Sequence, residues 1–388
     1  MATPKIRLKG FEGEWEPHSL KENVFSIIAG GDIDKNIIKE QGQYPVIANA
    51  LSNDGIVGYY DNYYRVKAPA VSVTGRGEIG FAKARKKSFT PVVRLLSIVS
   101  YHDVDFLANA INCLKVVQES TGVPQLTTDK LSQYEISFPN DIAEERAIGN
   151  YHVSLDSLIQ TTAKKIESLK QMKAASLISM FPQEGETTPK VRFKGFEGEW
   201  KKCQLKEIAT FSKGNGYSKA DLCSKGNPIV LYGRLYTHYS TIIDNVDTFA
   251  IAKENTVFSK GGEVVIPASG ETPEDIAIAS SIAKAGIILG GDLNILSFDN
   301  SKFNSPFIAL AISYSKTHFE LSRYAQGKSV VHLRNNDISN GHIELPSIQE
   351  QLAIASYFQN LDTQISLHTQ RLEKLKNIKA ECLNKMFV

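Results

Sequence analysis

Hydrophobic and polar positions follow a helical period in two long stretches of the chain. Within 140–181 and 347–388, apolar residues recur at alternating steps of four and three, which is the seam of a coiled coil. Neither stretch contains proline, and each begins directly after one, Pro139 or Pro346. We therefore expect two helices of about 35 residues, each roughly 50 Å long at 1.5 Å per residue. The expected seam positions are Leu155, Ile159, Thr162, Ile166 and Leu169, and Leu361, Ile365, His368, Leu372 and Leu375.

The starts and the seams of these helices carry polar residues at matching places. Asp141 with Glu144, and Ser347 with Glu350, have the spacing of a capping box. Thr162 and His368 fall at equivalent seam positions, and we interpret His368 as a residue that fixes register. If the second helix packs its seam on the first, it must run back along it, so the pair is expected to be antiparallel.

The remaining sequence predicts mixed α/β structure. Short apolar runs typical of strands cover 69–75, 92–100, 263–270 and 286–291. Short helical patterns cover 103–118 and 305–322.

The chain contains two internal sequence repeats. Residues 4–15 and 189–200 share ten of twelve positions at an offset of 185, and 147–181 share fourteen of 35 positions with 353–387 at an offset of 206. The stretches between, roughly 23–138 and 208–345, do not align visibly. After a duplication without functional meaning, the repeated segments and the stretches between them should both diverge, whereas here only the stretches between them have diverged. We interpret the pattern as one scaffold that presents two different binding domains.

The fold class expected from these patterns is α+β. Two pseudo-repeated mixed α/β domains are joined by two long helices in an antiparallel coiled coil, with an approximate two-fold axis. The expected boundaries are 1–140 for the first domain, 141–182 for the central helix, 183–346 for the second domain, and 347–388 for the C-terminal helix.

Positive charge is local rather than global. The chain has 44 Lys and Arg against 42 Asp and Glu, a net charge of +2, yet residues 65–94 hold eight basic residues and one acidic residue. Such a cluster is typical of a surface that contacts phosphates. It could also be an ordinary solvated face, but the adjacent glycine loop and the tyrosines of 59–65 favour binding. The glycine loop of the second region, 267–275, is acidic, and acidic side chains can accept from the amine of cytosine.

Several kinds of chemistry are disfavoured by the sequence. Residues 75–80 match a dinucleotide fingerprint, but no crossover helix follows them. The chain has no Pro-Pro dipeptide, so the motif of amino methyltransferases is absent, and the eight histidines and four cysteines have no metal-ligand spacing. We expect no catalytic or metal site in this chain. No apolar run approaches a membrane span and the N-terminus lacks a signal-peptide core, so we expect a cytoplasmic protein with no membrane contact.

The chain resembles the DNA-specificity subunit of type I restriction-modification systems. The resemblance covers essentially the whole chain. It rests on the leaders PKIRLKGFEGEW and PKVRFKGFEGEW, the loops SVTGRGEIG and IPASGETPEDI, and the helix starts FPNDIAEERAI and LPSIQEQLAI. It departs slightly at Glu144-Glu145-Arg146, which stands where the second helix has Glu350-Gln351-Leu352, so surface charge is expected to differ there.

The resemblance implies a division of labour. Each domain would be a target-recognition domain that reads one half of a split site in double-stranded DNA, and the helices would set the spacing. Two modification subunits would carry out adenine methylation, and restriction subunits would translocate and cleave DNA. This chain would then hold no cofactor, while S-adenosylmethionine, ATP and Mg would belong to the partner subunits.

We expect the DNA contacts to come from the basic run, the two glycine loops and nearby tyrosines. Arg76 is the candidate base reader of the first domain, and the lysines are candidate phosphate anchors. Two alternatives remain open: a coiled-coil scaffold that binds only proteins, and a self-contained DNA enzyme, which the motifs disfavour. The full set of expected contacts is Tyr63, Arg65, Thr74, Gly75, Arg76, Gly77, Lys83, Arg85, Lys86, Lys87, Gln125, Tyr232, Arg234, Tyr236, Ser269, Gly270, Glu271, Thr272, Lys328 and Arg334.

Overall fold

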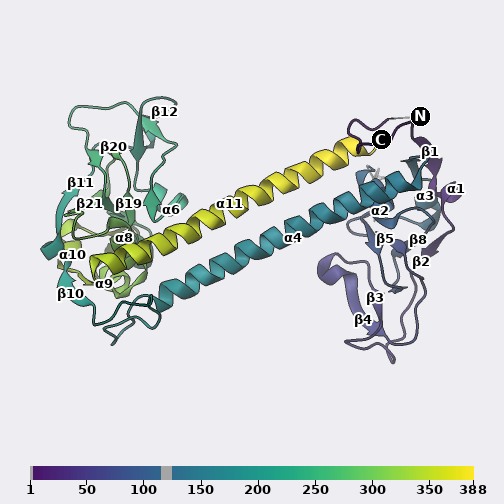
Figure 1. Cartoon of the computed structure of the whole chain (residues 1–388), viewed down its shortest axis with the longest axis horizontal. Helices are drawn as coiled ribbons and strands as arrows, with labels where there is room; N and C mark the ends of the chain where they lie inside the picture. The colour runs from purple at the N-terminus through teal and green to yellow at the C-terminus, as the bar shows by residue number, and fades with distance from the viewer. Residues whose placement is uncertain (1–2, 115–124) are drawn as a thin grey trace. The chain divides into compact units, whose positions relative to one another are not determined.

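The computed structural model describes residues 3–114 and 125–388, and its chain divides into two compact units. Unit 1 comprises Met1–Lys164 and Thr369–Val388, and unit 2 comprises Lys165–His368. The long helices are α4 (Ile142–Ser179) and α11 (Ile348–Met386) (Figure 1). Contacts therefore assign part of each helix to each unit, whereas the sequence patterns led us to set the helices apart as separate segments.

Unit 1 is a mixed α/β fold. Its main sheet has the order β2-β8-β5-β6 with antiparallel neighbours, and α2 packs against β5 and β6. A smaller sheet has the order β4-β3-β7, and β1 pairs with β9. The elements are β1 (Glu16–Ser19), α1 (Leu20–Asn23), β2 (Ser26–Ala29), β3 (Tyr44–Ile47), the 3-10 helix η1 (Ser52–Gly55), β4 (Ile56–Tyr60), β5 (Ala70–Thr74), β6 (Ala82–Arg85), β7 (Thr90–Pro91), β8 (Leu95–Val99), α2 (Val104–Cys113), α3 (Thr128–Ser132) and β9 (Glu135–Phe138).

Unit 2 has the same kind of architecture. Its main sheet has the order β11-β21-β17-β19-β14, and α8 packs against β17 and β19. A second sheet has the order β12-β15-β13-β20-β16, a small one has the order β18-β23-β22, and β10 pairs with β24. The elements are β10 (Lys201–Gln204), α5 (Leu205–Ile208), β11 (Ala209–Lys213), η2 (Lys219–Asp221), β12 (Leu222–Cys223), β13 (Asn227–Val230), α6 (Arg234–Thr237), β14 (Ile242–Ile243), β15 (Phe249–Ala250), β16 (Phe258–Lys260), β17 (Glu263–Pro267), β18 (Ser269–Gly270), α7 (Pro273–Ile276), β19 (Ser280–Ile282), β20 (Ala285–Leu289), β21 (Leu293–Phe298), α8 (Ser305–Tyr314), α9 (Lys316–Tyr324), β22 (Gln326–Gly327), β23 (Val331–His332), α10 (Asn335–Asn340) and β24 (His342–Leu345).

The two units share a topology that the sequence alignment does not show. The antiparallel order β2-β8-β5 of unit 1 recurs as β11-β21-β17 in unit 2. A helix packs on equivalent strands of each main sheet: α2 on β5 and β6 in unit 1, and α8 on β17 and β19 in unit 2. The diverged stretches are therefore variants of one fold, and this places their loops at comparable positions.

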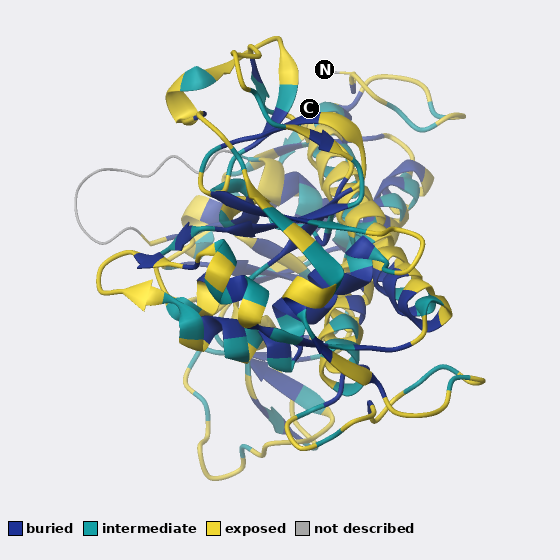
Figure 2. Cartoon of the chain, turned by 90° about the vertical axis from the view of Figure 1, so that its left-hand side faces the viewer, coloured by how far each residue is buried: buried dark blue, intermediate teal, exposed yellow. Residues whose placement is uncertain are grey.

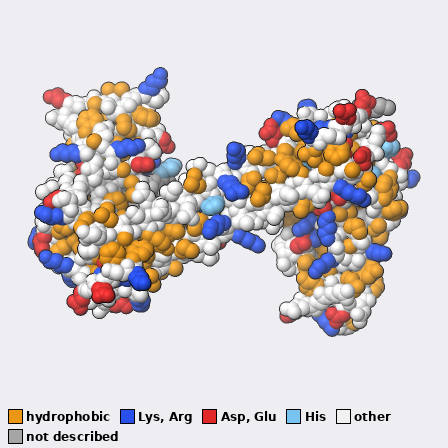
Figure 3. All heavy atoms as spheres, viewed as in Figure 1, with side chains coloured by type: hydrophobic (Ala, Val, Ile, Leu, Met, Phe, Trp, Pro, Cys, Tyr) orange, Lys and Arg blue, Asp and Glu red, His pale blue; other side chains and the backbone are white. Residues whose placement is uncertain are grey.

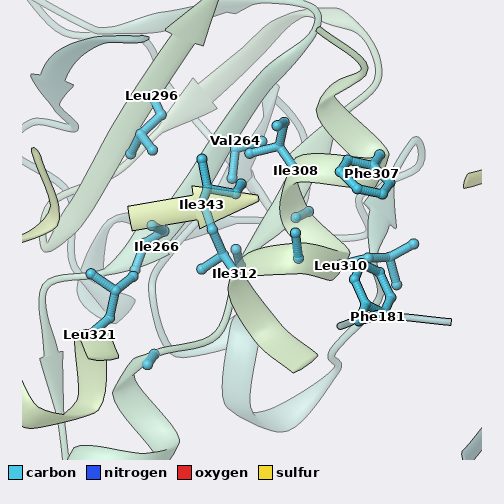
Figure 4. Packing of buried hydrophobic residues seen from close by; sticks show 14 of the residues in the cluster. Phe181, Val264, Ile266, Leu296, Phe307, Ile308, Leu310, Ile312, Leu321 and Ile343 are labelled. Carbon is cyan, nitrogen blue, oxygen red and sulfur yellow. The ribbon is translucent and has the colours of Figure 1, made fainter. Parts of the chain in front are cut away.

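The cores explain why the predicted elements form. In Figure 4, Val264, Ile266 and Leu296 of the main sheet face Ile308 and Ile312 of α8. Every strand position of β5 and of β17 is buried, including the polar residues Ser72 and Glu263. The buried segments of the chain are dark blue in Figure 2, and an edge strand such as β12 is exposed.

The predicted short elements are confirmed with two changes. Strands occur within all four predicted ranges. The helix expected over 305–322 is broken at Ser315, whose hydroxyl accepts from the Thr317 N–H at 3.2 Å and so begins α9. The helix expected over 103–118 ends at Cys113, and residues 115–118 lie outside the described residues.

Within each unit the segments of α4 and α11 run antiparallel. In both units, residues with rising numbers in α4 meet residues with falling numbers in α11. The contacts are Tyr151 Oη with Cys382 Sγ at 3.6 Å and Lys379 Nζ with Asp156 Oδ1 at 2.5 Å in unit 1, and Ser176 Oγ with Tyr357 Oη at 2.9 Å and Lys173 Nζ with Asp362 Oδ1 at 2.5 Å in unit 2. The positions in one set are related to those in the other by the offset of 206 found in the sequence.

The repeated leaders act as clasps on the helix starts. Arg7 donates to both carboxylate oxygens of buried Glu144, at 2.8 and 2.7 Å. Arg192 binds Glu350 in the same way, at 2.7 Å for both bonds. The capping-box prediction was thus half wrong: Asp141 does accept from the Ala143 N–H at 2.8 Å, but the Glu144 carboxylate faces the leader arginine.

The leader tryptophans pack on the opposite ends of the helices. Trp15 meets Phe387 with ring centroids 6.5 Å apart, and Trp200 meets Phe181 at 6.0 Å. Since Phe181 and Phe387 are repeat partners, each unit contains the start of one long helix and the end of the other.

The sequence difference between the starts of α4 and α11 lies mostly at buried positions. Glu145 accepts from the Asp103 N–H at 2.9 Å, and Gln351 accepts from the Asn304 N–H at 3.0 Å. Both side chains are buried, so the expected difference in surface charge reduces to Arg146 against Leu352.

Candidate nucleic-acid interface

The first glycine loop joins two antiparallel strands. Thr74 at the end of β5 accepts from the Phe81 N–H at 3.0 Å through its hydroxyl and from the Gly80 N–H at 2.8 Å through its carbonyl. Residues 75–80 therefore form the tip between β5 and β6. Because a dinucleotide fingerprint requires a crossover helix at this point, the prediction that this motif does not bind a dinucleotide agrees with the fold.

Close packing at the base of this loop requires glycine at position 75. A Cβ on Gly75 would lie 2.4 Å from the Arg94 carbonyl oxygen. Asn49 holds the loop from the other side, since its Oδ1 accepts from the Gly75 N–H at 2.7 Å and its Nδ2 donates to the Arg76 carbonyl at 2.7 Å. Gly77 follows with φ of +75°. The loop base is fixed while Arg76 is held near the surface.

A surface depression of about 600 Å³ lies beside this loop. Arg76 and Arg94 both line it, together with Asn49, Thr74 and exposed Glu78. Arg94 is exposed and Arg76 is partly exposed. Among residues 3–114 and 125–388, neither arginine side chain has a hydrogen-bond or ion-pair partner. Two guanidinium groups are thus available at one depression.

Part of the basic run is used inside the unit, which corrects one expected contact. Arg85 is 9% exposed, and burial lowers the pKa of its guanidinium. It donates to the Ser72 hydroxyl at 2.8 Å and pairs with Asp54 at 2.8 Å, so it supports the sheet instead of facing a ligand. Lys83 also pairs with Asp54, and Lys86 pairs with Asp105, although both lysines remain exposed. In Figure 3, Lys and Arg side chains lie among Asp and Glu side chains on the visible face of unit 1.

Other expected contacts of unit 1 lie at its surface. Lys87 is exposed and has no ion-pair partner in the described part of the chain. Tyr63 is 46% exposed, and its hydroxyl accepts from Arg65, which also donates to the Asp32 carbonyl at 2.5 Å. Gln125 is exposed and precedes Leu126, whose N–H donates to the Gly75 carbonyl at 2.8 Å. These residues keep their status as predicted DNA contacts.

The second glycine loop follows β17, the strand equivalent to β5. Ser269 lies in this loop, and its hydroxyl contacts Asp292 Oδ2 at 3.3 Å and His332 Nδ1 at 3.1 Å. The Tyr236 hydroxyl donates to the Ser269 carbonyl at 2.8 Å. Burial, together with the charges of Asp275 and Glu271, raises the pKa of Tyr236. The loop holds Glu271, Glu274 and Asp275, so it is acidic, as its sequence indicated.

The structure brings several more of the expected contacts of unit 2 to this loop. β18, which contains Ser269 and Gly270, pairs with β23, and β23 pairs with β22, so the turn bearing exposed Lys328 adjoins the loop. Thr272 is used structurally, because its hydroxyl accepts from the Asp275 N–H at 3.1 Å and caps α7. Glu271 is exposed.

The remaining expected contacts differ in what they do. Arg234 pairs with Asp247 at 2.5 Å, and Tyr232 packs near Tyr236 with ring centroids 6.4 Å apart. Arg334 is exposed at the start of α10.

Sequence reasoning missed four residues of these sites. Asn49, Asp292 and His332 were not considered, and Arg94 was counted only as part of the basic run. No local motif marks them, since their places depend on strand pairing. The part of the chain that the structure describes contains no cluster of three or more His, Cys, Asp or Glu able to hold a metal ion. None of its helices is long and apolar enough to cross a membrane.

The fold defines a class of protein in which two diverged α/β units are built on one repeated framework of leader and long helices. The chain belongs to the family of type I restriction modification DNA specificity domains, which match residues 12–171 and 197–377. Two copies of the domain thus cover most of the sequence, in agreement with the resemblance seen in its motifs.

Individual relatives are distant. A protein of Mycoplasma pneumoniae named as a type I specificity subunit is 27% identical over 132 residues, which are 33% of this chain and 36% of that relative. The specificity subunit of the MjaVIII type I restriction enzyme of Methanocaldococcus jannaschii is 22% identical over 283 residues, 70% of this chain and 65% of the relative. This chain therefore matches less than two thirds of the length of either relative.

A solved structure has the same fold. The crystal structure of the S subunit of a type I restriction-modification system from M. genitalium superposes with a TM-score of 0.62 at 17% identity. The match covers 100% of this chain and 99% of that one.

Proposed function

We propose that this chain is the DNA-reading subunit of a type I restriction-modification complex. Unit 1 reads one half of a bipartite site in double-stranded DNA and unit 2 reads the other half. The helices α4 and α11 set the separation between the half-sites. The chain itself performs no covalent chemistry.

One observation carries this proposal. The two units share a sheet topology, but the segment around the loop after β5, residues 65–94, holds eight basic residues and one acidic residue, whereas the loop after the equivalent strand β17, residues 267–275, is acidic. The framework around them is repeated down to single contacts, such as Arg7 with Glu144 and Arg192 with Glu350. A conserved frame with divergent loops suits recognition of two different sequences better than it suits a scaffold that binds only proteins.

The proposal assigns the chemistry to partners. Two modification subunits carry S-adenosylmethionine and methylate adenine, and restriction subunits use ATP and Mg to translocate and cleave DNA. The complex acts in the cytoplasm, where its DNA substrate is found.

Methylation mapping tests this function directly. The full chain is expressed with its modification partner in a host without adenine methylation of its own, and the methylated motifs of the host genome are sequenced. A motif of two short sequences separated by a fixed gap is expected, and it should vanish when this chain is omitted. Methylation that is unchanged without the chain, or absent from a bipartite motif with it, contradicts the proposal.

The exposed lysines provide a test of phosphate contact. Lys87→Ala should reduce the slope of log affinity against log salt by about one, because one fewer counterion is released from DNA. Arg85→Lys should leave the slope unchanged, since that side chain is interior. The affinity of the complex for its cognate duplex is measured between 50 and 200 mM salt, a range over which such contacts change affinity by orders of magnitude. An unchanged slope for Lys87→Ala removes this residue from the interface.

A further inference from the structure

Two exposed residues occupy equivalent turns beside the two loops. Arg94 directly precedes β8, and Asp292 directly precedes the equivalent strand β21. Their carbonyl oxygens accept the same kind of backbone hydrogen bond, from the Gly75 N–H at 3.0 Å and from the Ala268 N–H at 2.8 Å. Each turn therefore presents its side chain next to the loop that follows the neighbouring strand, and does so at one position of a shared frame.

Both residues adopt a backbone conformation that favours glycine. Arg94 has φ of +75° and Asp292 has φ of +57°. Aspartate tolerates the left-handed region, but it is uncommon for a long side chain such as arginine. Residues held in such conformations cluster at functional sites, where the position of the side chain outweighs the backbone cost. The turn could have been made with glycine, so the side chains themselves call for an explanation.

The chemistry at the two turns is opposite. In unit 1, Arg94 and Arg76 line one depression, where their guanidinium groups offer only hydrogen-bond donors and exposed Glu78 is the one acidic residue of the lining. In unit 2, Asp292 offers only acceptors when ionised: its Oδ2 accepts from the Ser269 hydroxyl at 3.3 Å, and its Oδ1 has no hydrogen-bond partner among the described residues. Exposed Glu271 lies in the adjoining loop. In the major groove, guanine presents two acceptors and cytosine presents an amino donor, so the two units suit bases of opposite polarity.

We propose that Arg94 and Asp292 are base-reading residues at equivalent positions of the two half-site readers. Arg94, together with Arg76, recognises the O6 and N7 acceptors of a guanine in one half-site. Asp292 accepts from the N4 amino group of a cytosine in the other half-site. This inference rests on the proposed function, because it specifies which bases each unit contacts.

Selection from random DNA tests the inference. The complex of the full chain with its modification subunits is used to select bound duplexes from a randomised library, and base preferences are compared among variants. Arg94→Gly and Asp292→Gly remove each side chain while suiting the positive φ, so folding should be retained. Arg94→Gly should lower the preference for one G·C pair by roughly 5- to 150-fold in one half-site only. Asp292→Gly should do the same at one position of the other half-site.

A matched control separates the backbone from the side chain. Asn255 also has a positive φ, of +64°, and lies outside both loops, so Asn255→Gly should leave every base preference intact. A wild-type complex that selects no bipartite motif contradicts the proposed function itself. A wild-type motif that Arg94→Gly leaves unchanged overturns the inference alone. A uniform loss of affinity with unchanged preferences also overturns it, because Arg94 would then contact phosphate.

Discussion

The leader arginines show how a single residue can tie a repeated segment to its unit. Arg7 reaches Glu144, which is 137 positions away in the chain and 1% exposed. A bidentate arginine–carboxylate pair of this kind is strong locally, yet both groups lose hydration when it forms. Removing only one of the two partners is therefore far more damaging than replacing both by apolar residues.

Arg7→Ala should destabilise unit 1 by about 3 kcal/mol, because it leaves a buried carboxylate without its partner. Denaturant unfolding followed by circular dichroism measures the change. Lys9→Ala, an exposed change in the same leader, should cost less than about 0.5 kcal/mol. Adding Glu144→Gln to Arg7→Ala should recover part of the loss, since the uncompensated charge disappears. Equal stability for Arg7→Ala and Lys9→Ala would show that the clasp contributes nothing.

His152 is a second residue with a measurable consequence. It is fully buried in α4, neither ring nitrogen has a hydrogen-bond partner among the described residues, and its repeat partner is Phe358. Burial and the nearby Lys379 lower its pKa to about 4, while Asp156 opposes the change. In the unfolded chain its pKa returns to near 6.5. The unfolded state therefore binds the proton more tightly, and stability must fall as pH drops from 6.5 toward 4.

His152→Phe should remove this pH dependence. At pH 7 its free energy of unfolding should be close to that of the wild type, and below pH 5 it should be higher by up to about 3 kcal/mol. Unfolding free energies across pH 4–8 provide the test. Phe358→His is the matched variant in unit 2 and should create a new loss of stability over the same pH range. Parallel pH profiles for wild type and His152→Phe would exclude His152 as the cause.

For single residues, the sequence predicted that basic side chains gather in one segment, but not which of them are buried and which are exposed. Arg85 and Arg94 belong to the same basic run, yet one is interior and the other lines a surface depression. The difference arises because Arg85 contacts Ser72 on the neighbouring strand and Asp54 in η1, whereas Arg94 sits in a turn against Gly75. Only strand pairing decides such matters, and a charge count contains no information on it.

Among the elements, periodicity predicted the long helices and the central strands because burial enforces those patterns. The break at Ser315 escaped notice because apolar residues continue on both sides of it, and a serine can cap a new helix as readily as sit inside one. The shared topology of the two units was hidden for a related reason. A sheet order is maintained by apolar character and backbone pairing, so its side chains can diverge completely while the order stays the same.

We expect the length of α4 and α11 to set the gap between the half-sites, and the contacts between these helices show where an insertion tests this. An insertion within 170–176 would disturb the contacts of Lys173 and Ser176 to α11, so a matched pair of insertions is preferable. Seven residues added after Lys164 and seven after His368 keep the antiparallel register within each unit and preserve the phase of the seam. They lengthen each helix by about 10 Å, close to three base pairs at 3.4 Å each.

The paired-insertion variant should retain both half-site sequences and recognise a gap longer by about three base pairs. Methylation mapping measures this gap. A single insertion after Lys164 alone is the control, and it should reduce activity because α4 and α11 fall out of register. A folded paired-insertion variant that keeps the original gap would mean that the partner subunits set the spacing.

For the whole molecule, the repeat predicted two domains and a returning helix, and the structure adds how each unit is closed. Cys382, Met386 and Phe387 pack in the core of unit 1 that contains Trp15, although they lie far from it in the sequence. Periodicity could not show this, because it reports the faces of a helix and not the partners of its ends. Each diverged stretch is thus enclosed by repeated segments, so an exchange cut at those segments should leave the other unit intact.

The most direct test of the account is an exchange of the first reader. Residues 24–134 are replaced by the matching region of a relative, which retains α1 and the ladder between β1 and β9. Genomic methylation is then mapped for the chimera and both parents. The account predicts that one half-site becomes that of the donor, while the other half-site and the gap stay as in the original chain. A change in both half-sites, or a motif identical to the original, would contradict independent reading by the two units.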